Sequence, residues 1–204
     1  TPKTGVTFKG AGAGTGGTRI NYSGSGFWLD LGATALADDV GFESMSVFCS
    51  GSALCVLRVG RTSEAYDAAL FRDRWHLRDL YVQGSSATLA NSIGISATEY
   101  IGWVLENVTI NSFRTSAIWD RGGISTQTRV RYQAYAFGPQ WTNSIGGCLD
   151  TCLSPEFLGP TVSGVAGTDY GYTVEIDANY VTFISALYET IAGGESRGYI
   201  HITN

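Results

Sequence analysis

Three acidic residues in the second half of the chain, Asp150, Glu175 and Asp177, are of the type that glycoside hydrolysis uses. Most glycosidases cleave with a pair of carboxylates, one acting as general acid and the other as nucleophile or base. A carboxyl group beside another carboxylate keeps its proton to higher pH, which a general acid requires. We therefore expect Glu175 to act as the acid and Asp150 as base or nucleophile, with Asp177 and Asp120 nearby.

Three further residues could hold a sugar chain next to these carboxylates. The indole of Trp119 could stack on a sugar ring, and the guanidinium of Arg121 could bind a sugar carboxylate through two hydrogen bonds. His201 could transfer a proton in a lyase-type elimination. The alternative is that all these side chains form only a solvated face or a subunit contact, because the outward residues of any solenoid are polar.

An imperfect sequence repeat would bring these residues together. Apolar residues two positions apart recur at 29–31, 57–59, 93–95, 118–120, 149–151, 174–176 and 200–202, in steps of 28, 36, 25, 31, 25 and 26 residues. A second series interleaves with the first at 42–47, 77–82, 105–110, 132–137, 157–162 and 183–188. Repeats of this length are typical of solenoids, and two series predict two strands in each coil.

Strand geometry converts the repeat into columns of side chains. Successive residues of a strand point to opposite faces, so the residue between two inward apolar residues points outward. The first series then predicts an outward column of Asp30, Arg58, Gly94, Trp119, Asp150, Glu175 and His201. A second outward column, two residues later, contains Arg121 and Asp177. A register shift of one residue would turn a column to the other face.

The segment at residues 5–26 is rich in glycine, and Gly12, Gly14 and Gly17 match the pattern G-x-G-x-x-G. A dinucleotide-binding loop of that pattern lies between a strand and a helix. The residues after Gly17 are Thr-Arg-Ile-Asn-Tyr, which are typical of a strand, so we predict two strands joined by a glycine-rich turn. Residues 64–75 contain helix formers and no Gly or Pro, which predicts a short helical excursion.

The composition favours a β-rich domain and argues against several classes of function. Glycine accounts for 27 of 204 residues, and the net charge is −5 without a Lys/Arg cluster. An acidic chain of this kind is a poor nucleic-acid binder. The sequence also contains no apolar run of about 18 residues, the length that predicts a membrane-spanning helix. The cysteines lack the spacing of a zinc site, so disulfides and free thiols both remain open at Cys49, Cys55, Cys148 and Cys152. We expect no metal ion and no cofactor.

The opening Gly-Val-Thr-Phe-Lys-Gly-Ala-Gly at 5–12, Gly-Thr-Arg-Ile at 17–20 and the strand-like runs at 77–84 and 105–110 carry a family resemblance. They resemble the right-handed, single-stranded parallel β-helix of the pectate-lyase superfamily, and most of all the β-helix of bacteriophage tailspike and depolymerase proteins. The resemblance extends over residues 1–204 and implies an all-β solenoid of about seven coils in one domain. We expect this chain to be part of a longer one.

The same resemblance implies a function on a virion tail or outside the cell. A homotrimer would bind a bacterial capsular polysaccharide or lipopolysaccharide and depolymerise it by hydrolysis or β-elimination. The catalytic motifs of polygalacturonases and the calcium-binding aspartates of pectate lyases are absent from the sequence, so the resemblance carries over no catalytic residue. Two alternatives therefore stand beside the enzyme: a β-helix that binds a glycan without cleaving it, and a structural module of a spike or fibre.

Overall fold

The structure, a computed structural model, describes the chain in segments that become shorter after residue 142. These segments are 5–31, 38–50, 55–59, 72–86, 89–98, 100–120, 125–133, 139–142, 150–153, 156–158, 174–176, 181–184, 187–189 and 200–202. The regular elements in them are all β-strands, which confirms the predicted all-β class. Within these segments, no helix is long and apolar enough to cross a membrane.

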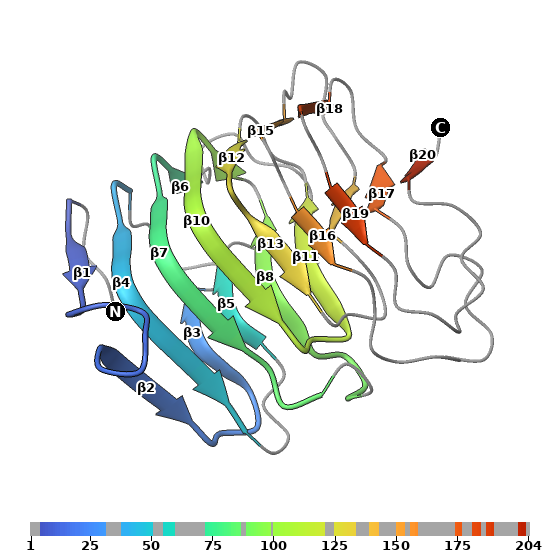
Figure 1. The fold of residues 1–204 in the computed structure, drawn as a ribbon. Helices are drawn as coiled ribbons and strands as arrows, with labels where there is room; N and C mark the ends of the chain where they lie inside the picture. Colours follow the sequence, from blue (N-terminus) through green and yellow to red (C-terminus); the bar gives the residue numbers. More distant parts are fainter. Residues whose placement is uncertain are drawn as a thin grey trace.

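Most of the strands belong to two parallel sheets, which Figure 1 shows advancing in order from the blue to the red end of the chain. The larger one, sheet A, has eleven strands, and its central path is β1 (Thr7–Lys9), β4 (Gly41–Cys49), β7 (His76–Gln83), β10 (Trp103–Asn111), β12 (Ser125–Thr128), β15 (Asp150–Leu153) and β18 (Val181–Ile184). Four shorter strands complete it: β2 (Thr18–Tyr22), β13 (Arg131–Gln133), β16 (Glu156–Leu158) and β19 (Leu187–Glu189).

The smaller one, sheet B, has seven strands and lies behind sheet A in the view of Figure 1. It consists of β3 (Phe27–Leu31), β5 (Cys55–Val59), β8 (Ile93–Thr98), β11 (Thr115–Asp120), β14 (Gln140–Thr142), β17 (Val174–Ile176) and β20 (Ile200–Ile202). A third pair, β6 (Arg72–Asp73) with β9 (Tyr100–Ile101), is also parallel. From β2 onward the chain alternates between the two sheets, as the two interleaved series of the sequence predict.

The register in sheet A confirms the predicted columns over three strands. Phe42 pairs with Leu77 and Leu77 with Leu105, while five residues later Val47, Val82 and Ile110 form the next column. The fourth predicted segment, 132–137, is wrong by five residues, because Ile110 pairs with Tyr132 and Leu105 with Gln127. The buried Gln127 stands where the pattern expects an apolar residue. The Tyr132 hydroxyl donates a 2.6 Å hydrogen bond to Gln127 Oε1, which satisfies this buried acceptor.

The register in sheet B confirms only the two ends of the predicted outward column. Asp30 pairs with Arg58, and Glu175 pairs with His201. Between them, the column runs through residues that the prediction did not contain, namely Ser96, Ile118 and Gln140. At Ser96 and Ile118 the observed register differs from the predicted one by two residues and by one residue. At Gln140 the pattern failed because β14 contains Gln-Trp-Thr, which lacks the aliphatic pair on which the repeat was recognised.

Each long strand of sheet A contains one residue with left-handed backbone conformation at the same level of the sheet. These residues are Ser44 (φ 55°) in β4, Asp79 (φ 49°) in β7 and Asn107 (φ 54°) in β10, and Arg129 (φ 53°) has the same conformation between β12 and β13. The extra residue shifts the alternation of side chains, so that the buried positions of β10 are 103, 105, 108 and 110. This shift explains why the inward columns at Leu105 and Ile110 are five residues apart instead of an even number.

The core lies between the two sheets and is rich in tryptophan. Trp75 and Trp103 stack with ring centroids 5.1 Å apart, and Trp103 meets Trp119 of sheet B edge-on at 6.0 Å. All three side chains are at most 1% exposed. Burying three large aromatic side chains of this kind contributes several kcal/mol to stability and fixes the distance between the sheets.

The helical excursion predicted at 64–75 is wrong at its described end. Arg72 and Asp73 form strand β6, and Trp75 is fully buried in the tryptophan stack. Pairing with β9 and packing on Trp103 both require an extended chain, and these tertiary contacts override a helix propensity of a few tenths of a kcal/mol per residue. The preceding part of the excursion, residues 64–71, lies outside the described residues.

One of the four cysteines can be assigned. Cys49, at the end of β4, is a buried free thiol, and burial raises its pKa to about 11 from the ordinary value of 9.0. It therefore stays protonated at neutral pH and is a poor nucleophile. Cys55 and Cys152 lie in strands β5 and β15, whereas Cys148 lies outside the described residues.

The left-handed position in β10 gives a test of the bend. Valine is strongly disfavoured at a positive φ, so Asn107→Val should lower the free energy of unfolding by about 1–3 kcal/mol in urea denaturation. Asn107→Gly is the matched control, because it also removes the side chain that donates to Asp79 but tolerates the backbone conformation. Equal losses in both variants would contradict a cost from the backbone conformation.

Candidate functional site

The structure does not bring the two predicted catalytic carboxylates together. Asp150 lies in β15 of sheet A, where it pairs with Ser125 and Val181. Glu175 lies in β17 of sheet B, where it pairs with Gln140 and His201. The predicted adjacency is therefore wrong, because residues 150–153 belong to sheet A and β14 occupies the sheet B position that the pattern gave to them.

The predicted sugar-binding residues have different outcomes. Trp119 is 1% exposed and packs edge-on against Trp103, so the prediction that it points outward is wrong. The inward residues around it are not those of the predicted pattern: Ala117 is buried as Trp119 is, and Ile118 between them is half-buried. His201 is the register partner of Glu175, as predicted. Arg121 and Asp177 lie outside the described residues.

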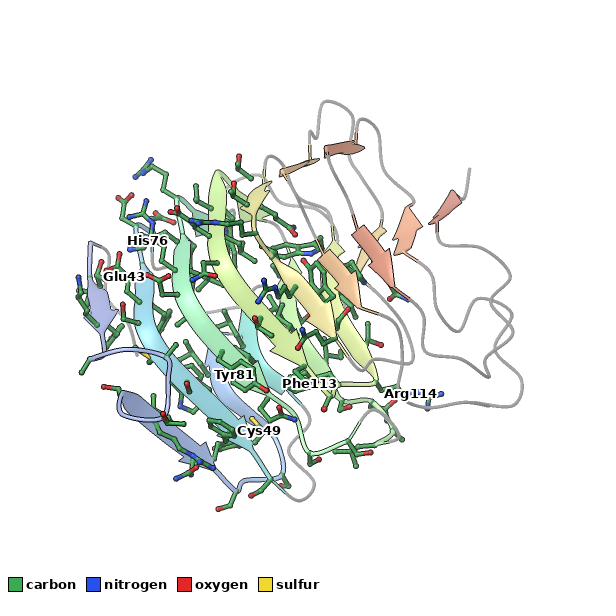
Figure 2. The ribbon with its side chains drawn as sticks, viewed as in Figure 1. Glu43, Cys49, His76, Tyr81, Phe113 and Arg114 are labelled. Atoms are coloured by element: carbon green, nitrogen blue, oxygen red, sulfur yellow. The ribbon has the colours of Figure 1, made fainter. Side chains whose placement is uncertain are left out.

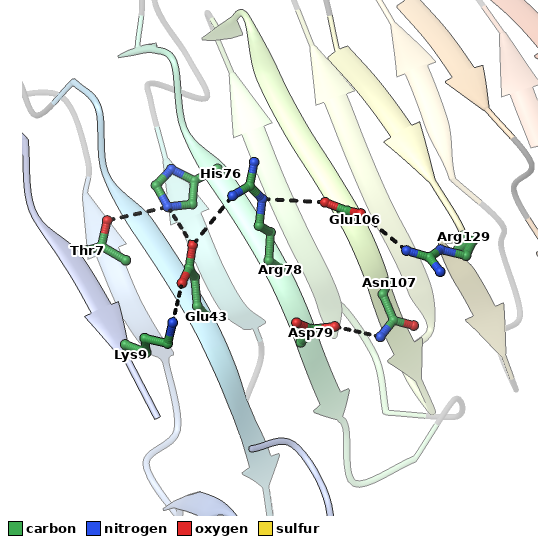
Figure 3. Close-up of polar contacts among 9 residues, drawn as sticks. All are labelled: Thr7, Lys9, Glu43, His76, Arg78, Asp79, Glu106, Asn107 and Arg129. Carbon is green, nitrogen blue, oxygen red and sulfur yellow. Dashed lines mark hydrogen bonds and ion pairs between the residues drawn. The ribbon is translucent and has the colours of Figure 1, made fainter. Parts of the chain in front are cut away.

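A row of alternating charges crosses the outer face of sheet A. Lys9, Glu43, Arg78 and Glu106 are register partners on four successive strands. Figure 3 shows the ion pairs between them, at 3.5 Å for Lys9–Glu43, 3.8 Å for Arg78–Glu43 and 3.5 Å for Arg78–Glu106. Arg129 adds a pair with Glu106 at 3.2 Å. We call these five residues the charge row.

Glu43 is the centre of this row. Besides Lys9 and Arg78 it contacts His76, whose Nε2 lies 3.3 Å from Oε1, and its side chain is only 17% exposed. Thr7 also lies 3.4 Å from His76 Nε2. Outside the row, just before β4 and β7, Arg74 binds Asp39 through two nitrogens at 2.5 and 2.8 Å. The Arg74 hydrogen bonds hold the pKa of Asp39 below its ordinary value. The row therefore ties neighbouring strands together.

A groove lies on the other side of the bend, beside the glycine-rich loop at residues 10–17. It consists of two hollows, of about 450 Å³ and about 330 Å³, and both are lined by Ala13 and Tyr81. The first hollow is also lined by Asp79, Asn107 and Thr109. The second hollow is also lined by Gly14, Thr15, Gly17, Arg19, Ser46 and Phe48. We call these two hollows together the Gly-loop groove.

The glycine-rich loop forms one wall of this groove because β4 holds it in place. β1 and β2 pair with successive parts of β4, and the loop spans the bend at Ser44 between them. Gly12 N donates to Ser44 O at 2.8 Å, and Ser46 Oγ donates to Ala13 O at 2.6 Å. A side chain at Gly17 would collide with the backbone of Gly12. The predicted turn between two strands is confirmed, and no helix follows the G-x-G-x-x-G pattern.

A hydrogen-bond network fixes the aromatic ring at the centre of the groove. The Tyr81 hydroxyl donates to Gln83 Oε1 at 2.7 Å and accepts from Asn111 Nδ2 at 3.0 Å. Its ring lies 5.8 Å from that of Phe48. Figure 2 shows Tyr81 toward the Cys49 end of the sheet, away from Glu43 and His76. A half-buried tyrosine held in this way presents an apolar face to a ligand at little cost in side-chain entropy.

Polar groups surround that ring in the first hollow. Asp79 is exposed and accepts a 2.7 Å hydrogen bond from Asn107 Nδ2, on the next strand. Thr109 adds a hydroxyl. A fixed aromatic face with a carboxylate, an amide and a hydroxyl around it matches the C–H faces and hydroxyl groups of a sugar. In the part of the chain that the structure describes, no group of three or more His, Cys, Asp or Glu residues could hold a metal ion.

Sequence reasoning missed these groove residues. It treated residues 77–84 and 105–110 as scaffold strands only. A detectable signal was the spacing of Asp79 and Asn107, which occupy equivalent positions in those two strands. The spacing could not show that both residues adopt the left-handed conformation, nor that the glycine-rich loop lies beside them.

Comparisons with protein-family models, with curated proteins and with solved structures found no match for this chain. The function is therefore argued from the geometry of the groove and from the resemblance of the sequence.

The charge row predicts a difference between its two carboxylates. Glu43→Gln should lower the free energy of unfolding by about 1 kcal/mol more than Glu106→Gln, because Glu43 is less exposed and contacts His76 in addition to Lys9 and Arg78. Urea denaturation at low salt would measure both, and 1 M NaCl should reduce the difference. Equal effects of the two variants at low salt would contradict a central role for Glu43.

Proposed function

We propose that this chain is a right-handed, single-stranded parallel β-helix that binds a polysaccharide in the Gly-loop groove. Along the sequence, a strand of sheet B comes between each two successive strands on the central path of sheet A, and both sheets are parallel. This alternation supports the β-helix. The two-stranded sheet of β6 and β9, just before β7 and β10, supports a third face. In this fold each coil adds one strand to each sheet, and the outer face of sheet A is a long wall.

The observation that carries the proposal is the fixed ring of Tyr81 between two adjoining hollows. Both hollows are within the range of about 300–1,000 Å³ that is usual for small-ligand sites. A sugar residue in the first hollow stacks on Tyr81 and exchanges hydrogen bonds with Asp79, Asn107 and Thr109. The next residue of the same polymer enters the second hollow along the glycine-rich loop.

The resemblance to phage tailspikes points to the source of the polymer. It favours a bacterial capsular polysaccharide or lipopolysaccharide as the ligand, a homotrimer as the assembly and a virion tail as the location. No feature of the groove bears on the bacterial source of the polymer, on the homotrimer or on the virion tail, and all three stay predictions.

Binding is better supported than cleavage. Asp79 is the one carboxylate among the described residues that line the groove, whereas glycoside hydrolysis takes two. A depolymerase remains a second hypothesis, although Asp150 and Glu175 lie in different sheets and do not form the predicted pair. The non-catalytic glycan-binding spike is the function that the geometry supports best.

Substitution of the central tyrosine tests the binding site. Against a panel of capsular polysaccharides and lipopolysaccharides, Tyr81→Ala should weaken binding at least about tenfold, or about 1.4 kcal/mol, in calorimetry. Tyr81→Phe keeps the ring and should lose less. Phe8→Ala removes an exposed aromatic ring outside the groove and is the control, with folding checked by circular dichroism. Unchanged affinity of Tyr81→Ala, or no binding of the panel by the wild type, would contradict the proposal.

Cleavage is tested on the same panel by following reducing ends and ultraviolet absorbance of unsaturated products. For a binding protein we expect neither signal from a polymer that binds. New reducing ends that disappear in Asp150→Asn or Glu175→Gln would instead establish the hydrolase, and an absorbance signal that disappears in His201→Ala would establish the lyase.

A further inference from the structure

Arg19, a cation that lines the groove, differs in its partners from four other cations of this part of the chain. Lys9, Arg74, Arg78 and Arg129 each form an ion pair with an Asp or Glu residue. Arg19 is exposed and lines the second hollow, and among the described residues no carboxylate is within ion-pair distance of it. Arg19 contacts the neutral side chains of Asn21 and Phe48, so its positive charge is available to a ligand.

Two contacts fix the orientation of the Arg19 guanidinium. Its central carbon lies 3.8 Å from the centroid of the Phe48 ring, and its Nε donates a 2.8 Å hydrogen bond to Asn21 Oδ1. Both contacts leave the two terminal nitrogens without an acceptor in the described part of the chain. Because the guanidinium is already oriented, a ligand that binds these nitrogens pays little of the usual cost of ordering an arginine side chain.

The two hollows differ in charge. The first contains Asp79, which repels an anion, and the second contains Arg19 and no carboxylate among its described lining residues. The loop residues Gly14 and Gly17 line the second hollow without side chains, which leaves room for a substituent on a sugar ring. A ligand that spans both hollows is therefore complementary when it carries its negative charge on only one of two neighbouring sugar residues.

We propose that the Gly-loop groove selects an acidic heteropolysaccharide, with the carboxylate of a uronic or sialic acid residue bound by the terminal nitrogens of Arg19. Planar guanidinium groups bind carboxylates through two parallel hydrogen bonds. The neighbouring neutral sugar lies in the first hollow against Asp79 and Asn107, and Tyr81 contacts both residues. This inference rests on the proposed function, because it names the class of polymer for the same groove.

The test compares each acidic polymer with a neutral derivative of itself. Capsular polysaccharides in which glucuronate or sialate alternates with a neutral sugar would be measured against their carboxyl-reduced forms by calorimetry. The wild type should bind the acidic member of a pair at least about tenfold more tightly, and Arg19→Gln should abolish this preference without weakening binding to the reduced form. The affinity of the wild type should also fall with salt more steeply than that of Arg19→Gln.

Arg129→Gln is the matched control, because it removes an exposed cation from the same face outside the lining of both hollows and should keep the preference. Equal binding of acidic and reduced polymers by the wild type, or a preference that survives in Arg19→Gln, would overturn the inference while leaving the glycan-binding function intact. A preference for sulfated or phosphorylated polymers over carboxylated ones would also overturn it. Absence of binding to every polymer would overturn the proposed function and the inference together.

Discussion

The left-handed residue in each long strand of sheet A is the constraint on which the rest of the outer face depends. At this residue the strand bends and the alternation of inward and outward side chains shifts by one position. Inward residues are therefore odd-numbered before the bend in β10 and even-numbered after it. The charge row consists of residues before the bend, with Arg129 at the bend itself, whereas residues at the bend and after it line the groove. The bend also exposes Ser44 O to Gly12 N and thereby positions the glycine-rich loop. A strand without the bend would keep a regular alternation and present one uniform polar face.

The charge row and the groove divide the outer face between stability and binding. In the row, carboxylates and cations alternate from strand to strand and satisfy one another, so little net charge is left for a ligand. In the groove, Asp79 has an amide partner and Arg19 has an amide and a ring as partners, so both retain their charge toward solvent. An ion pair ties strands together at the expense of recognition, whereas a charge oriented by neutral partners remains available for recognition.

The sequence was sufficient for the fold class and for the part of the register that aliphatic residues mark. Phe42, Leu77 and Leu105 mark equivalent positions although the steps between them differ, and the predicted column is correct there. The prediction failed where a polar residue is buried with its own partner, as Gln127 is with Tyr132, and where β14 lacks the aliphatic pair. Asp150 and Glu175 were placed side by side for this reason, because the prediction gave the place of the missed strand β14 in sheet B to residues 149–151, which precede β17 in the series.

The groove could not be predicted from the sequence for a different reason. Ser44, Asp79, Asn107 and Arg129 share a backbone conformation, but they are polar like many other residues of the chain, so their types alone do not mark the bend. Arg19 resembles the other exposed cations until the structure shows which of them have carboxylate partners. The resemblance to tailspikes leads to the same kind of ligand from the scaffold motifs alone, and it says nothing about where the polymer binds. The proposed location rests on three contacts between segments distant in sequence: the glycine-rich loop on β4, Tyr81 beside Phe48, and Asn107 on Asp79.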